Sequence, residues 1–370
     1  MATKRIPWID LAKAIAIVAI IVGHFTAFFA SASPAADAAF RLMDSFHVPL
    51  FFLLSGYCLK GPLDRARAAK LAKRCLLPYA FCGAACLVAC ALLINGVRIE
   101  QHLFGLFYGA GAYRDHILFA DAADVQAIGV LWFLPSLLFG QLFASLCLRA
   151  GKLGPGLPLA LSFALFLVGA TTAGLLFLPW DIQQALCAAW FICCGYLLKR
   201  YEVLRRPWAR RALQMAGALY MAALVGGVLE EPMYCNSTYH QPVLDGLGCV
   251  GAACLVTSLA KGLERLPQRA EATLSWVGRN TLAIFCFHAI TLATGDHLKW
   301  WLLDLASSGL GVAVVLPVSL GVDLALSIGL AWAVRFVPGV RTVFGYRPPD
   351  QAALRGDGSV TPRAGRQPGR

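Results

Sequence analysis

The chain has 370 residues, of which 59% are hydrophobic and 14% are charged, and its formal net charge is +12. This composition excludes a soluble domain held by one anchor and indicates a polytopic membrane protein, with the lipid bilayer as a partner. In a soluble protein such a charge would suggest nucleic-acid binding. Here the basic residues lie in short loops between apolar runs, so they indicate topology, and no nucleic-acid partner is predicted.

Hydropathy predicts an all-α fold of about ten transmembrane helices. The expected spans are residues 8–29, 46–60, 75–95, 127–148, 157–178, 180–198, 211–229, 242–260, 279–296 and 310–336. Lys and Arg are concentrated in alternate connections, as the positive-inside rule requires for a protein with both termini in the cytoplasm. Residues 1–340 are expected to form one membrane domain. Residues 341–370 are expected to form a basic, Pro/Gly-rich cytoplasmic tail that is disordered.

The longest connection is the predicted outer loop 96–126. It carries charged side chains and two histidines, which are Arg98, Glu100, His102, Arg114, Asp115, His116, Asp121 and Asp124. We expect these side chains to be solvated, and we expect the loop to cover an outward-facing site.

The first hydrophobic run, Trp8 to Phe29, carries Asp10, Lys13 and His24. Charged groups inside lipid are costly unless they face protein or water. Lys13 and His24 are eleven residues apart, so at ~100° per residue they lie on one face of a helix. They are separated by ~16 Å along the axis, and Asp10 lies one turn below Lys13. We interpret the three as one wall of a polar site. The alternative is a snorkelling Lys and a His that a neighbouring helix satisfies.

The thirteen cysteines form no CxxC pattern, and nearly all lie in apolar runs. Cys82, Cys86 and Cys90 recur every fourth residue, which favours a helix–helix seam over a metal site. Only Cys235 falls in a predicted loop, so neither a disulfide network nor a metal site is expected. The chain also has no Walker loop, GxSxG elbow or HExxH motif, which argues against an ATP-driven pump, an α/β-hydrolase and a membrane metalloprotease.

Four further stretches accompany the first span. They are FHVPLFFLLSGY at 46–57, KLAKRCLLPY at 70–79, LWFLPSL at 131–137 and LSWVGRNTL at 274–282, the last followed by Phe287-His288. Together with the first span, these stretches resemble acyltransferase family 3 of integral-membrane O-acyltransferases, and within it the branch of fucose 4-O-acetylase-like proteins. The resemblance covers residue 8 to about residue 290, with five motifs in order.

The resemblance implies roles for the basic residues. The family's first span carries a basic residue, ten intervening residues and a His, which Lys13 and His24 match. The family also has an Arg-x-x-Arg motif at the cytoplasmic start of the third span. Its nearest equivalent here is Lys70-x-x-Lys73 with Arg74. Cations bind phosphate, so we expect these residues to bind the CoA part of an acyl donor. The alternative is that they only anchor the topology.

Acyl transfer to a hydroxyl needs a base, and a His with a pKa near neutral suits that task. We predict that His24 is the general base, with Lys13, His47 and Asp10 as further catalytic candidates. Asp10 is the less direct partner, because ~21 Å of helix separates it from His24. His47 and His288 can orient or relay, or they can be buried histidines that only pack.

Trp132 and Asn280 lie in the motif stretches, and with His288 they are predicted to bind substrate or donor. The expected activity is O-acetyl transfer from cytoplasmic acetyl-CoA to a hydroxyl of an extracytoplasmic or membrane-linked saccharide, in the bacterial inner membrane. Acyl-CoA is then a substrate, and no permanently bound cofactor is expected. Two alternatives stay open. One is a proton-coupled secondary transporter that uses the Asp10, Lys13 and His24 stripe, and the other is a pseudoenzyme that only binds membrane glycans.

Overall fold

A computed structural model describes residues 6–94, 98–112, 116–118, 125–293 and 295–346 of the chain. In this part of the chain all regular secondary structure is helical. β-pairing is limited to two isolated bridges. The α-helices are α1 (Pro7–Phe28), α2 (Pro34–Asp44), α3 (His47–Cys58), α4 (Arg65–Leu93), α5 (Ile99–Tyr108), α6 (Phe133–Arg149), α7 (Leu157–Thr172), α8 (Ile182–Arg200), α9 (Pro207–Val225), α10 (Pro242–Leu263), α11 (Gln268–Arg279), α12 (Thr281–Ala293), α13 (Gly295–Leu305), α14 (Val312–Ala333) and α15 (Val340–Val343).

The predicted all-α membrane architecture is confirmed. Each of the ten predicted spans coincides with a helix, and seven helical stretches of the described residues are long and apolar enough to cross a membrane. Two other predicted spans, α7 and α12, are shorter apolar helices. The number of crossings and the cytoplasmic location of both termini therefore stay predictions.

Local sequence explains where several helices begin. Pro7 and Pro34 stand at the first helical positions of α1 and α2, where a missing N–H costs nothing. The Ser33 hydroxyl accepts a hydrogen bond from the Ala36 N–H and so caps α2. The Asp64 carboxylate does the same for α4, accepting from the Arg67 N–H at 2.8 Å. The Asp64 cap fixes the start of α4 just before its basic residues.

The outer loop 96–126 is more ordered than predicted. It contains α5, in which the side chain of His102 is buried rather than solvated, so that expectation was wrong for His102. The Tyr79 hydroxyl donates to the carbonyl of Leu106 at 2.6 Å and ties α5 to α4. The positions predicted at Arg114, Asp115, Asp121 and Asp124 lie outside the described residues.

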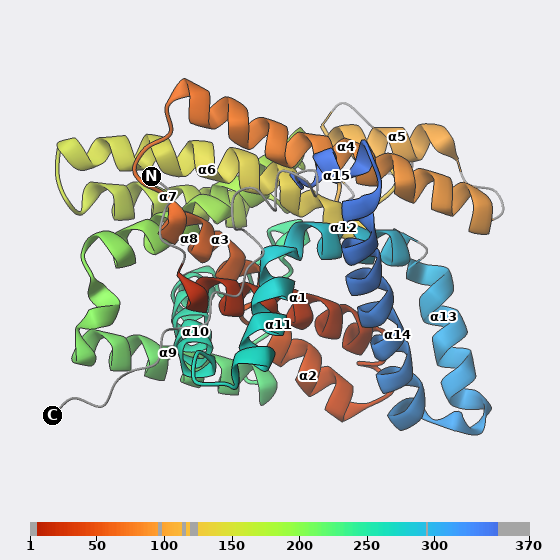
Figure 1. Cartoon of the computed structure of the whole chain (residues 1–370). Coiled ribbons are helices and arrows are strands. Elements are labelled where there is room, and N and C mark those ends of the chain that lie inside the picture. The colour runs from red at the N-terminus through yellow and green to blue at the C-terminus, as the bar shows by residue number, and fades with distance from the viewer. Residues whose placement is uncertain (1–5, 95–97, 113–115, 119–124, 294, 347–370) are drawn as a thin grey trace, which may run out of the picture.

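Helix α1 lies in the middle of the bundle (Figure 1), where it contacts α2, α3, α10, α11, α12 and α14. This placement explains why so much of a span with three ionisable residues is buried. The cysteine stripe of α4 packs on α12, with the Sγ of Cys86 and Cys90 directed at backbone carbonyls of that helix. The predicted helix–helix seam is therefore confirmed, and none of the thirteen cysteines, all of which the structure describes, is in a disulfide.

The predicted tail begins inside the folded part of the chain. Helix α15 follows α14, and the hydroxyl of Tyr346 donates to Oδ1 of Asn280 at 2.7 Å. The rest of the segment predicted to be disordered, residues 347–370, lies outside the described residues.

Candidate functional site

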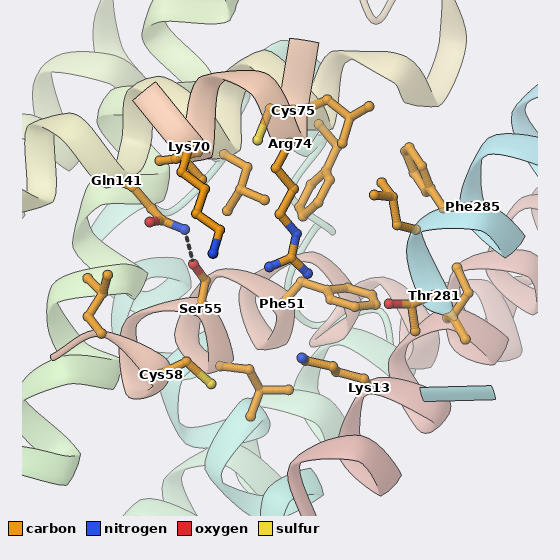
Figure 2. Close-up of a pocket in the computed structure, with 18 of the residues that line it drawn as sticks. Lys13, Phe51, Ser55, Cys58, Lys70, Arg74, Cys75, Gln141, Thr281 and Phe285 are labelled. Carbon is orange, nitrogen blue, oxygen red and sulfur yellow. Dashed lines mark hydrogen bonds between the residues drawn. The ribbon is translucent and has the colours of Figure 1, made fainter. Parts of the chain in front are cut away.

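A cavity of about 350 Å³ opens between α1, α3, α4, α6 and α12. Figure 2 shows that side chains from α4 approach it from one side and Lys13 of α1 from the other. Cations from α4 line one side of the cavity. Most of the remaining wall, called here the body of the cavity, is apolar. The lining includes Lys13, Ile17 and Ile20 of α1, Phe51, Ser55 and Cys58 of α3, Arg67, Lys70 and Arg74 of α4, Gln141 of α6, and Thr281 and Phe285 of α12.

Four cations line this cavity, and none of the described residues that line it is acidic. Arg67, Lys70 and Arg74 follow one another at three and four residues, so they share one face of α4. Lys70 and Arg74 point into the cavity opposite Lys13 (Figure 2). Such a cluster attracts an anion with several charges, such as a phosphorylated ligand.

Of the basic residues of α4 that were predicted to bind the donor, one is absent from the cavity wall, and one unpredicted basic residue is present. Lys73 is exposed and does not line the cavity, whereas Arg67 does. The Arg67 Nε donates to Asp64 at 2.7 Å and its guanidinium also donates to the Pro62 carbonyl at 2.8 Å. The backbone N–H of Arg67, followed by its guanidinium, lowers the pKa of Asp64 and keeps that carboxyl ionised.

The body of the cavity is lined by aliphatic and aromatic side chains, with three polar exceptions. Gln141 donates through Nε2 to the Ser55 hydroxyl at 2.6 Å, and Thr281 lies across from them (Figure 2). A few polar groups in an otherwise apolar wall are typical of a site that orients an elongated ligand.

Beyond the cavity, three ionisable side chains from three helices form a chain. Nδ1 of His24 on α1 lies 3.1 Å from Nε2 of His288 on α12. Nδ1 of His288 lies 2.8 Å from Oδ2 of Asp323 on α14. His288 and Asp323 are 0% and 2% exposed, so the chain is sheltered from solvent at its inner end. The two imidazole rings are stacked with centroids 5.3 Å apart.

The cavity and the histidine pair are neighbours along two helices. On α1 the wall residue Ile20 is followed one turn later by His24, ~6 Å further along the axis. On α12 the wall residue Phe285 is followed three residues later by His288. Along α1, Lys13, the apolar wall residues Ile17 and Ile20, and His24 thus follow one another, whereas the other three cations approach the cavity from α4.

The remaining predicted residues lie elsewhere. His47 is buried, with Nδ1 bonded to the Met43 carbonyl at 2.8 Å and its ring against Tyr234. Asp10 is buried where α1 crosses α11, its backbone close to Gly278.

Neither Asn280 nor Trp132 lines the cavity. Asn280 donates to the Trp276 carbonyl at 2.6 Å and accepts from Tyr346. Trp132 is buried beside Phe133. Binding roles for these two residues stay predictions.

Asp323 was not among the predicted site residues, although the sequence carries a signal for it. Asp323 is the single acidic residue of the apolar run 310–336. An acidic residue at the middle of a membrane span is a candidate functional residue, because placing an ionisable group inside the membrane costs free energy. Its partner could not be named, because only the packing of α14 on α12 brings Asp323 to His288.

The apolar helices, the cation-lined cavity and the histidine pair beyond it define a polytopic membrane protein with an internal polar site. The chain belongs to acyltransferase family 3: the family's model, described as an acyltransferase domain, matches residues 6–327. Neither the curated proteins nor the solved structures include a match to this chain.

The family membership establishes the protein as a membrane acyltransferase and confirms the resemblance seen in the sequence motifs. The matched region extends past residue 290 and includes Asp323. The fucose 4-O-acetylase-like branch stays a prediction. The comparisons provide no support for a transporter.

Proposed function

We propose that this acyltransferase moves an acyl group, in the first place acetyl, from acyl-CoA to a hydroxyl of a saccharide or glycolipid, with His24 as the general base. The observation that carries this proposal is a cation-lined cavity whose wall residue Ile20 precedes His24 by one turn of α1, and whose wall residue Phe285 precedes His288 on α12.

The cations suit the phosphates of CoA. The 3′-phosphate and the pyrophosphate would contact Lys70, Arg74 and Lys13, with Arg67 at the rim held by Asp64. Several cations are needed, since a single solvent-exposed ion pair between a phosphate and a cation contributes little binding free energy in water. The predicted topology puts this side of the protein in the cytoplasm, where acyl-CoA is made.

The body of the cavity suits the pantetheine arm. Its methylene groups would pack on Ile17 and Ile20, and its amides would face the hydrogen-bonded pair Ser55 and Gln141. The ~16 Å between Lys13 and His24 is comparable with the reach of that arm. The thioester carbon would then arrive beside His24.

The proposed reaction is direct attack of the acceptor hydroxyl on the thioester. His24 takes the hydroxyl proton as the new C–O bond forms, because a neutral alcohol is a poor nucleophile. The C–S bond breaks, and the proton passes from His24 to the departing sulfur, so that CoA leaves as its thiol. The acceptor is expected to reach His24 from the extracytoplasmic side.

Radiolabelled acetyl-CoA tests this proposal in membrane vesicles that contain the wild-type protein. Label should enter the saccharide or glycolipid fraction, and His24→Ala should abolish transfer. The matched control is His240→Ala, since His240 is exposed and paired with Glu230 at 2.9 Å, away from the cavity. No label with wild type, or undiminished label with His24→Ala, would refute the proposal. Vesicles of opposite orientation show from which side acetyl-CoA is used.

A further inference from the structure

Asp323 does not line the cavity, yet it is 2% exposed and within hydrogen-bond distance of His288. We propose that Asp323 is a positioning residue: acting through His288, it sets the tautomer of His24 so that Nε2 carries the lone pair that accepts the hydroxyl proton. This inference rests on the proposed role of His24 as base.

The order of protons follows from the three atoms in contact. In the proposed arrangement the Asp323 carboxylate accepts through Oδ2 from Nδ1–H of His288, the usual way in which a carboxylate fixes the tautomer of a buried His. A neutral imidazole with a proton on Nδ1 has an acceptor at Nε2. Nε2 of His288 must then accept from Nδ1 of His24, 3.1 Å away. His24 is left with an unprotonated Nε2.

The same chain stabilises the state after proton transfer. When Nε2 of His24 takes the proton, the ring becomes a cation whose Nδ1–H already donates to His288. The ionised Asp323 at the end of the chain favours this positive charge, and no proton has to reach the carboxylate. Three helices shelter His288 and Asp323 from water, which strengthens the electrostatic interaction between the carboxylate and the imidazolium.

The near-isosteric change Asp323→Asn removes the carboxylate, which can only accept a hydrogen bond, so the order is no longer fixed. Where the Asn amide N–H donates to Nδ1 of His288, the ring proton of His288 lies on Nε2. That proton would donate to Nδ1 of His24 and leave the proton of His24 on Nε2, where no base remains. We expect kcat to fall at least about a hundredfold, the scale of general-base catalysis, with KM for acetyl-CoA unchanged within about twofold. Asp323→Glu keeps a carboxylate, so its kcat should be at least about tenfold higher than that of Asp323→Asn.

The experiment measures kcat and KM for wild type, Asp323→Asn, Asp323→Glu and Ser327→Ala. Ser327 is the matched control, since it is buried one turn further along α14, and its variant should keep the wild-type kcat. A second pair, His288→Gln with and without Asp323→Asn, forms a double-mutant cycle. If Asp323 acts only through His288, the Asn change should have no further effect once His288 is Gln.

The outcomes separate this inference from the proposed function. No transfer by wild type, or full transfer by His24→Ala, would remove the proposed function itself. Loss with His24→Ala but wild-type kcat with Asp323→Asn would overturn only the role of Asp323. Equal losses from Asp323→Asn in both His288 backgrounds would overturn it too. The role of Asp323 would also be overturned if both Asp323 variants unfold while His288→Gln folds with full kcat, because Asp323 would then serve the fold alone.

Discussion

The donor site gives the sharpest test, because α4 offers adjacent cations of which one faces the cavity and the next does not. We expect Arg74→Ala to raise KM for acetyl-CoA about tenfold with little change in kcat. A hydrogen bond to a charged group contributes about 1.5–3 kcal/mol. Arg74 is exposed to water and salt, so the lower end applies, and about 1.4 kcal/mol corresponds to tenfold. Lys70→Ala should behave in the same way.

The matched control is Lys73→Ala, which removes a cation from the same helix without touching the cavity wall. It should leave KM within about twofold of wild type, since an exposed charge at this distance is screened. A second donor isolates the phosphates. With S-acetyl-N-acetylcysteamine, which carries the thioester but no phosphate, Arg74→Ala should match wild type.

Steady-state transfer of radiolabelled acetyl groups in detergent or vesicles supplies both constants. Equal effects of Arg74→Ala and Lys73→Ala would refute the geometric argument and leave these cations as topology signals. An equal loss with the phosphate-free donor would show that Arg74 acts on the fold or the chemistry rather than on CoA.

Three further outcomes follow from the same geometry. The Cys58 thiol is exposed at the cavity wall, so CoA should slow its alkylation by a maleimide, as measured by mass spectrometry. Alkylation of Cys235 should be unaffected by CoA. Equal rates of Cys58 alkylation with and without CoA would argue against the donor site. Ile20→Trp fills the apolar body and should lower kcat/KM about a hundredfold by displacing the thioester; wild-type kinetics would show that the arm runs elsewhere. A Cβ at Gly56 would overlap a backbone carbonyl of α8, so Gly56→Ala should cost about 1–3 kcal/mol and lower the Tm in detergent. Gly262→Ala, where a Cβ meets open space, is its control and should not lower the Tm.

Most helices could be predicted because hydropathy is a local property of the chain. Each predicted span holds a helix, whereas α5 was taken as loop because ten residues that include Glu100 and His102 are too short and polar for a crossing. What orders α5 is a tertiary contact, the hydrogen bond from Tyr79 to the α5 backbone. Such a contact leaves no periodic trace in the sequence.

The candidate site divides in the same way. The helical period alone put Lys13 and His24 on one face, and the structure places Lys13 on the cavity wall and His24 one turn past its end. The basic run was recognised, but its hydropathy does not say which face of α4 lines the cavity. Lys73 therefore entered the predicted donor set, and Arg67 did not.

By itself the sequence determined the membrane class, the family and the ionisable stripe of α1, since all three follow from composition, period and motifs within short windows. Only the tertiary structure decided which groups meet. His24 and His288 are 264 residues apart in the chain, and His288 and Asp323 are 35 apart. Those contacts depend on how α12 and α14 pack beside α1, which is set by the fit of whole helix surfaces rather than by any local pattern.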